Sequence, residues 1–168
     1  MKRMFQGGTV LLAVLLVCFL PINSFGKGTC TKGNCKKGHG TATLADGTTY
    51  TGEFKKGKYD GQGTLTLPDG SIYEGQFKEG KRCGQGTITR PDGSKYVGEW
   101  ENDDPHGQGT WFCSDGGKYE GQWKKSIFDG QGTFTYANGS KFAGEFKHGC
   151  TTEKGAWTYP DAAANDNK

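Results

Sequence analysis

Side chains that could bind a metal ion recur at one position of this chain, 23 residues apart. Asp60, Cys83, His106 and Asp129 are all of types that coordinate divalent ions. A metal needs its ligands within a few ångström, whereas equivalent residues of successive strand pairs lie two strands, roughly 10 Å, apart. If each repeat is a pair of strands, the four side chains are too far apart, so we expect no metal and no cofactor.

Catalytic chemistry also lacks a supporting pattern. The three histidines, His39, His106 and His148, each belong to a different repeat. Acid–base catalysis and nucleophile activation require side chains within hydrogen-bond reach of one another. A carboxylate or amide that recurs at one position instead indicates one structural hydrogen bond repeated in each unit, so we expect no catalytic residue and no enzyme. The residues at this position are Glu53, Gln76, Glu99, Gln122 and Glu145.

A 23-residue repeat determines the elements that position these residues. Each unit begins aromatic-x-Gly-Glu/Gln-Phe/Trp, and in the first four units Gly-Gln-Gly follows. Residues 50–54 and 63–67 of the first unit alternate between two faces, which is the period of a β-strand. The repeat therefore predicts an all-β fold of tandem β-hairpins. The units begin at Tyr50, Tyr73, Tyr96, Tyr119 and Phe142.

Turn residues indicate how the hairpins are joined. Pro68-Asp-Gly-Ser71 recurs in similar form between units, and Asp-Gly or Asn-Gly supplies the positive φ of a tight turn. The sheet should therefore continue from unit to unit. The opposite connection, residues 55–60, is predicted to be a longer loop. Glycines inside the strands, such as Gly52 and Gly63, should leave room for an aromatic ring of a neighbouring strand to lie over bare backbone.

The repeat also sets the expected domain boundaries. The array spans residues 38–160 and starts with a partial repeat at residues 38–49, before the five full units. A cysteine-containing cap at residues 27–37 precedes it. Residues 161–168 form a polar tail that we expect to be disordered.

Residues 1–26 have the features of a secretory signal peptide. A basic start is followed by an apolar run from Thr9 to Leu20 and by small residues that favour cleavage near Gly26. The run is shorter than the roughly 20 residues that span a bilayer, so an uncleaved anchor is the weaker alternative. A lipoprotein signal at Cys18 is also weaker, because Val17 precedes the cysteine in place of a small residue.

The charge of the mature chain excludes one class of partner. Cleavage removes two of the 21 basic residues and none of the 18 acidic ones, so the mature chain is nearly neutral. A nucleic-acid-binding protein carries a clustered basic excess. We therefore expect no nucleic-acid partner.

The run Tyr-x-Gly-Glu-Phe-x-x-Gly-x-x-x-Gly-x-Gly resembles the MORN (membrane occupation and recognition nexus) repeat. Residues 50–57 with 61–63 match it at every defining position, whereas Asp103 and Ser126 depart from the mid-loop glycine. The resemblance covers about residues 38–160. It implies an elongated, twisted antiparallel sheet with a concave face, in a scaffold for protein assembly, self-association or attachment at a membrane.

The resemblance extends to the cysteine-containing cap. Bacterial secreted members of the family begin with a short cysteine segment, and Cys30-Thr-Lys-Gly-Asn-Cys35 is similar to it. We therefore expect a secreted protein of the bacterial periplasm or the extracellular space.

In an oxidising compartment Cys30 and Cys35 are expected to form a disulfide that caps the first strand. The other cysteines do not obviously pair, because equivalent residues of neighbouring units exceed the Cα separation of about 7 Å that a disulfide spans. Cys113 is expected to be a buried small hydrophobe. Cys83 and Cys150 lie at the loop edge, where an intermolecular disulfide remains an alternative.

Two surfaces are candidates for binding a partner. The first is the aromatic concave face, through which we expect a protein to bind or assemble. The second is the loop edge, whose lysines and Arg82 could bind an acidic partner or a phospholipid, although a solvated edge that prevents aggregation is the better explanation of them. Acidic residues of the third unit, Glu101, Asp103 and Asp104, interrupt that edge. We therefore favour a secreted, non-enzymatic protein-binding scaffold over a membrane-surface phospholipid module.

The candidate residues follow from the repeat positions. The aromatic candidates are Tyr50, Phe54, Tyr73, Phe77, Tyr96, Trp100, Trp111, Tyr119 and Trp123, with Leu65, Ile88, Phe134 and Trp157 on the same face. The lysine candidates are Lys55, Lys56, Lys78, Lys81, Lys124 and Lys125.

Overall fold

The computed structural model describes residues 28–160, which form twelve β-strands and no helix. The strands are β1 (Thr29–Gly33), β2 (Lys37–Thr43), β3 (Thr49–Lys55), β4 (Lys58–Thr66), β5 (Ile72–Lys78), β6 (Lys81–Thr89), β7 (Lys95–Glu101), β8 (Asp104–Phe112), β9 (Lys118–Lys124), β10 (Ile127–Thr135), β11 (Lys141–Lys147) and β12 (Cys150–Thr158). The predicted signal peptide and polar tail lie outside the described residues.

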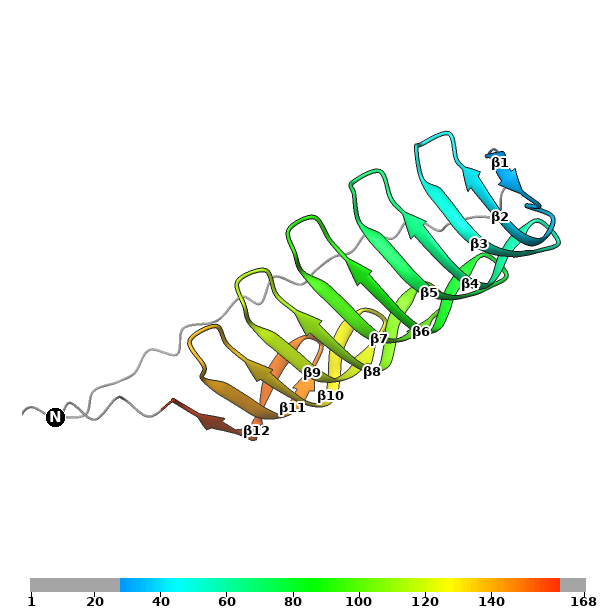
Figure 1. The fold of residues 1–168 in the computed structure, drawn as a ribbon. Helices are drawn as coiled ribbons and strands as arrows, with labels where there is room; N and C mark the ends of the chain where they lie inside the picture. Colours follow the sequence, from blue (N-terminus) through cyan, green and yellow to red (C-terminus); the bar gives the residue numbers. More distant parts are fainter. Residues whose placement is uncertain (1–27, 161–168) are drawn as a thin grey trace, which may run out of the picture.

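All twelve strands belong to one open sheet in the order β1 to β12, and each pairs antiparallel with its neighbours in sequence. Figure 1 shows the hairpins lying one after another in a long row, with β1 and β12 at the two ends. The prediction of an all-β fold of tandem hairpins is confirmed.

The register repeats with the sequence. Within the first hairpin, Tyr50 lies opposite Leu65 and Gly52 lies opposite Gly63. Between units, Leu65 lies opposite Tyr73. From the second unit onward, the first strand of each unit therefore places its aromatic ring beside the large apolar residue of the strand before it.

The two kinds of connection differ from the sequence prediction. At the predicted loop the turn has two residues, Lys56 and Gly57, with φ of 52° and 75°, and β4 begins at Lys58. At the other edge residues 67–71 separate β4 from β5, with Gly70 at a φ of 86° as expected. The longer loop and the tighter turn are thus exchanged, because β4 continues through a bulge instead of starting at Gly63.

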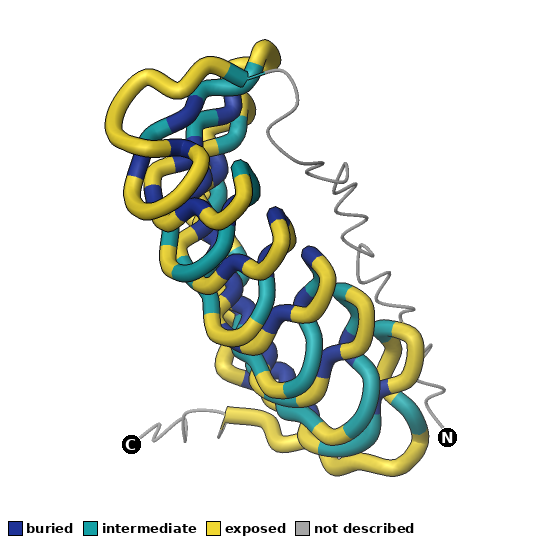
Figure 2. The backbone as a smooth tube through the Cα atoms, turned by 90° about the vertical axis from the view of Figure 1, so that its right-hand side faces the viewer, coloured by how far each residue is buried: buried dark blue, intermediate teal, exposed yellow. Residues whose placement is uncertain are grey.

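The core lies along the inner face of this sheet, which we define as the face that carries Tyr50 and its equivalents. The outer face carries polar residues such as Thr51, which is exposed. A single sheet has no second layer, so the side chains of the inner face must cover one another. Figure 2 shows the buried residues recurring along the whole row, with the backbone of each unit following a rounded path about them.

Candidate interaction surface

The nine aromatic residues that the sequence singled out for partner contact lie in the core. Each side chain is at most 7% exposed. The prediction that they form a binding face is therefore wrong, because these rings are the layer that covers the inner face. They are Tyr50, Phe54, Tyr73, Phe77, Tyr96, Trp100, Trp111, Tyr119 and Trp123.

One unit illustrates how the rings pack. The Tyr50 ring stacks on Tyr59 with centroids 3.8 Å apart, and it meets Phe54 and Phe77 edge to face at 5.1 and 5.0 Å. Its hydroxyl donates to the carbonyl of Glu53 at 2.9 Å. Burial raises the pKa of the core tyrosines, that of Tyr59 to about 12. These contacts link each unit to the next, since Phe77 belongs to the second unit.

The glycines inside the strands have the role predicted for them. A Cβ atom built on Gly86 would lie 2.6 Å from Cε2 of the Tyr73 ring. A Cβ atom on Gly75 would lie 2.6 Å from the Cα of Gly86 across the pair. Only glycine lets the tyrosine lie flat on the neighbouring strand, so the prediction of bare backbone beneath the rings is confirmed.

The recurring carboxylate or amide serves a β-bulge. Residues 60–62 of β4 lie opposite the single residue Glu53, which leaves backbone groups of the bulge outside the regular ladder. Glu53 Oε1 accepts a hydrogen bond from the backbone N of Gln62 at 3.1 Å. The same bond joins Glu99 to Gln108 at 3.0 Å and Gln122 to Gln131 at 2.8 Å. The predicted structural role is confirmed in these three units.

Arg82 does not lie on the loop edge, contrary to prediction, but is fully buried. Its backbone N and Nε donate to Asp103 Oδ1 at 2.9 and 3.2 Å, and Nη2 donates to the Asp103 carbonyl at 2.9 Å. The guanidinium carbon lies 4.7 Å from the centroid of the Trp100 ring. Desolvation lowers the pKa of Arg82, and Asp103 opposes that shift. Two charges expected at the surface thus neutralise each other inside the protein.

The repeat position of Arg82 explains its burial. Tyr59 and Phe128 occupy the same position in the first and fourth units, and each stacks on the tyrosine of its unit at 3.8 Å. Asp103, with a φ of 76°, replaces Gly80 of the unit before. Arg82 thus replaces an aromatic ring and Asp103 replaces a glycine at two positions that are in contact. This joint departure from the repeat is the signal in the sequence that could have predicted the buried pair.

The hairpin tips are joined in a second ladder of hydrogen bonds. The backbone N of Gly80 donates to the Tyr59 carbonyl at 2.8 Å, and equivalent bonds at the other tips measure 2.9–3.1 Å. This ladder holds each tip against the preceding unit. The other donor and acceptor pairs are Gly57 to Lys36, Asp103 to Arg82, Ser126 to Pro105 and Gly149 to Phe128.

The six candidate lysines all lie at the hairpin tips and are exposed, but they do not form one uniform basic edge. Lys78 pairs with Asp60 at 4.0 Å, and the neighbouring Lys58 pairs with Glu79 at 3.4 Å. Acidic residues Glu101 and Asp104 separate the second unit from the fourth. The six are Lys55, Lys56, Lys78, Lys81, Lys124 and Lys125.

A different column of residues reaches the surface beside the core, and we call it the rim column. Its members share one repeat position just after each second strand, and all but the last are half-buried. Tyr136 packs on Phe134 at 4.6 Å, and Arg90 lies over Trp111 at 5.1 Å. The residue type differs among the first four units, and tyrosine recurs in the fifth, whereas the core column that begins at Tyr50 is tyrosine in all of the first four units. The rim column comprises Leu67, Arg90, Cys113, Tyr136 and Tyr159.

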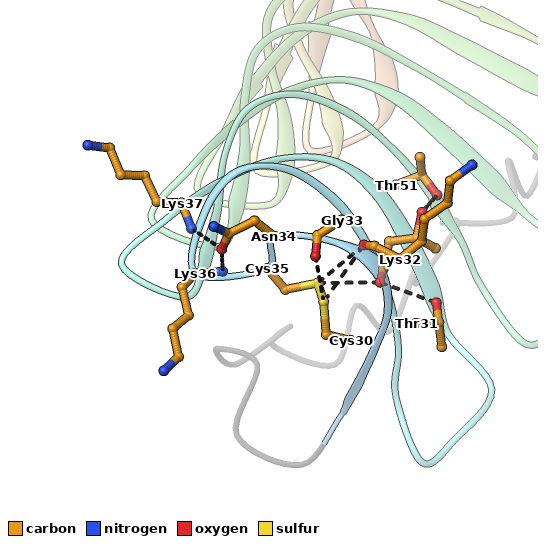
Figure 3. Close-up of a disulfide and its surroundings, with 10 residues drawn as sticks. Cys30, Thr31, Lys32, Gly33, Asn34, Cys35, Lys36, Lys37 and Thr51 are labelled. Atoms are coloured by element: carbon orange, nitrogen blue, oxygen red, sulfur yellow. Dashed lines mark hydrogen bonds between the residues drawn. A yellow bond between two sulfur atoms is a disulfide. The ribbon is translucent and has the colours of Figure 1, made fainter.

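The cysteines follow most of the predictions. Cys30 and Cys35 form a disulfide, with Cα atoms 5.9 Å apart, beside the turn in which Asn34 Oδ1 accepts from the backbone N of Lys36 (Figure 3). Cys83, Cys113 and Cys150 are free. Cys113 is only partly buried, and its burial raises the pKa of the thiol. The predicted disulfide is confirmed, and it joins Cys30 of β1 to Cys35 in the turn before β2.

The described part of the chain has neither clustered metal ligands nor a long apolar helix. Residues 28–160 contain no group of three or more His, Cys, Asp or Glu side chains placed to hold a metal ion. The same range has no helix of the length and apolar character that crossing a membrane requires.

The fold and its repeated contacts define a class, the stacked β-hairpin repeat protein whose core runs through the whole row of units. The family model of the MORN repeat matches residues 50–72, 73–95, 96–118 and 119–141, which is more than half of the chain. The chain therefore belongs to the MORN repeat family.

Comparison with curated proteins finds no match. Among solved structures, the TCP domain of SAS-4 from Drosophila melanogaster, described in complex with a proline-rich motif of Ana2, has a TM-score of 0.52 and 12% identity, over 80% of this chain and 73% of that chain. The G-box domain of the microcephaly protein CPAP has a TM-score of 0.46 and 19% identity, over 72% of this chain and 66% of that chain.

Proposed function

We propose that this protein is a secreted, non-enzymatic scaffold that binds another protein through its rim column. The observation that carries the proposal is the contrast between the two sets of columns. The core aromatic side chains cover one another, whereas the rim column offers partly exposed side chains, most of them apolar, whose type differs among the first four units. A repeat protein acquires specificity by varying such positions on a constant frame.

A solved structure of similar fold supports the proposal that the ligand is a protein. The SAS-4 domain, which shares the open sheet at a TM-score of 0.52, is described with a bound proline-rich motif of Ana2. A sheet of this architecture is therefore compatible with a bound motif of another protein. MORN repeats in tandem are in keeping with the same role.

Two observations support secretion. Residues 1–26 have the pattern of a signal peptide, and the Cys30–Cys35 disulfide is of the kind that persists in oxidising compartments. A bacterial periplasm or the extracellular space satisfies both. N-terminal sequencing of the exported protein should give a chain that starts at Lys27.

The alternative, a phospholipid-binding module, depends on the lysines of the hairpin tips. The ion pairs of Lys58 and Lys78, and the acidic third unit, reduce the positive potential that an anionic surface would attract. The scaffold is therefore the better supported of the two.

Affinity capture from solubilised envelope of the source cell separates these functions. The bait is the purified mature chain, compared with a rim variant, Arg90→Ser with Tyr136→Ser, and with a variant carrying all six lysines as Gln. We expect one discrete protein to be retained by wild type and by the lysine variant and lost with the rim variant. Phe112→Ser, which alters an exposed ring outside the rim, is the matched control.

Two results would contradict the proposal. One is capture of the same protein by the rim variant, which would place the contact elsewhere. The other is binding to phosphatidylglycerol vesicles that the lysine variant loses, with no protein retained, which would favour the membrane module.

A further inference from the structure

The last strand leaves exposed a side chain that every earlier unit covers. Trp157 occupies the position of Leu65, Ile88, Trp111 and Phe134, which are 0–7% exposed, yet Trp157 is 46% exposed. The difference arises because those four residues are each followed by another strand of the sheet, whereas β12 pairs only with β11 among the described strands.

The array itself shows what covers this position. Leu65 lies opposite Tyr73, and Trp111 lies opposite Tyr119, each on the first strand of the next unit. The covering strand always runs antiparallel and reads aromatic-x-Gly-Glu/Gln-aromatic. Its second aromatic ring meets the first ring of the preceding unit edge to face, as Trp123 meets Tyr96 at 4.8 Å.

A charged residue of β12 indicates which residue type a covering strand should carry at one position. Lys154 stands where the earlier units have Gln108 or Gln131, residues that lie opposite Gln122 and Glu145 of the next strand. The Lys154 side chain is 82% exposed and pairs with Glu145 of β11 at 3.3 Å. Opposite charges directly across a strand pair are favourable. An acidic residue should therefore be preferred opposite Lys154.

We propose that the free edge of β12 binds an extended segment of a partner protein as an added antiparallel strand, with the sequence aromatic-x-Gly-Glu-aromatic. The free backbone groups of an edge strand supply the pairing, and Trp157 selects the first aromatic ring. The inference rests on the proposed function, since it defines one segment that a protein partner would contribute.

A second copy of this chain does not fit the edge as well. The strands at the two ends of the described sheet are β1, which reads Thr-Cys-Thr-Lys-Gly, and β12 itself. Neither contains the aromatic-x-Gly-Glu-aromatic pattern. The occupant is therefore a segment of another protein.

A peptide with the sequence of residues 141–147, Lys-Phe-Ala-Gly-Glu-Phe-Lys, is the probe. Trp157 is the exposed one of four tryptophans, because Trp100, Trp111 and Trp123 are buried, so acrylamide quenching reports on the β12 edge. Adding the peptide to the purified protein should shift the emission to the blue and reduce quenching. A peptide with both phenylalanines replaced by serine should change neither.

Protein variants locate the site by anisotropy of the fluorescein-labelled peptide. Trp157→Ser should lose binding, whereas Phe112→Ser, which alters a ring of similar exposure on β8, should retain it. Lys154→Glu should weaken binding, and a peptide with Glu145→Lys should restore it. Circular dichroism checks that each variant is folded.

Equal binding by the Trp157→Ser protein would overturn the inference. So would a wild-type dimer that ignores the peptide and becomes a monomer on Trp157→Ser, since β12 would then pair with its own copy. If the peptide fails to bind while wild type still captures a protein through the rim column, the inference fails and the proposed function stands.

Discussion

Replacing Asp103 by glycine tests the buried ion pair that joins the second and third units. Arg82 would remain inside the protein without the carboxylate that accepts from its backbone N and Nε. Removing one partner of a buried ion pair costs about 3–5 kcal/mol. Relief of the positive φ at this position returns about 1 kcal/mol. We therefore expect Asp103→Gly to lower the free energy of unfolding by about 2–4 kcal/mol.

A second change should reverse this loss. Arg82→Tyr together with Asp103→Gly reproduces the pair of Tyr59 in the first unit and Gly80 in the second, where a stacked ring fills the same position. Apolar groups that replace a buried ion pair at similar volume are neutral or stabilising by about 1–4 kcal/mol. The double variant should therefore be at least as stable as wild type.

Urea unfolding followed by circular dichroism and tryptophan fluorescence measures these differences. Repeat arrays can unfold unit by unit, so the two probes must give coincident transitions before free energies are compared. Asp103→Asn, which keeps an acceptor oxygen and removes the charge, should fall between wild type and Asp103→Gly. Wild-type stability of Asp103→Gly would contradict this account of the ion pair, and so would a double variant that is less stable than Asp103→Gly.

Three further predictions concern the core and the cap. Gly86→Ala should lower the free energy of unfolding by about 3 kcal/mol, because its Cβ would meet the Tyr73 ring. Gly93→Ala, where the Cβ meets open space but φ is positive, should lower it by about 1 kcal/mol in the same urea assay. The core tyrosines keep their protons in the folded protein, because burial raises their pKa, and lose them above about pH 10 in the unfolded chain. The free energy of unfolding should therefore fall above about pH 10, by about 1.4 kcal/mol per pH unit for each tyrosine. Urea titrations from pH 8 to 12 measure this. A flat profile above pH 10 would contradict this. Replacing Cys30 and Cys35 by serine should cost about 2 kcal/mol and speed amide hydrogen exchange in β1 and β2 alone, because units contact only their neighbours.

The sequence predicted those features that depend on one unit and its register. The period gave the hairpins, and alternation placed Gly52 on the same face as Tyr50, so the steric need for glycine could be worked out before the fold was known. The repeated glutamate suggested a repeated hydrogen bond, although its acceptor role at a bulge was not foreseen. A bulge has no signature in the alternation, which explains why β4 starts at Lys58 and not at Gly63.

The candidate surface was less predictable, because exposure depends on how neighbouring units cover each other. Trp111 and Trp157 occupy the same repeat position, but one is buried and the other is nearly half exposed. Only the number of strands that follow each residue separates them. Arg82 and Asp103 likewise pair across two units, a contact that no rule for a single hairpin contains.

The arrangement of the strands has a mechanical consequence. The strands lie across the long axis of the row, so a pulling force applied between β1 and β12 acts along the hydrogen bonds that join neighbouring strands (Figure 1). Such a load opens one strand pair at a time, like a zipper, and never has to shear a whole ladder at once. The hydrogen bonds between hairpin tips are a second set of contacts, and they must break whenever two neighbouring hairpins separate. Under tension the molecule should therefore lengthen in steps of one hairpin, starting from an end.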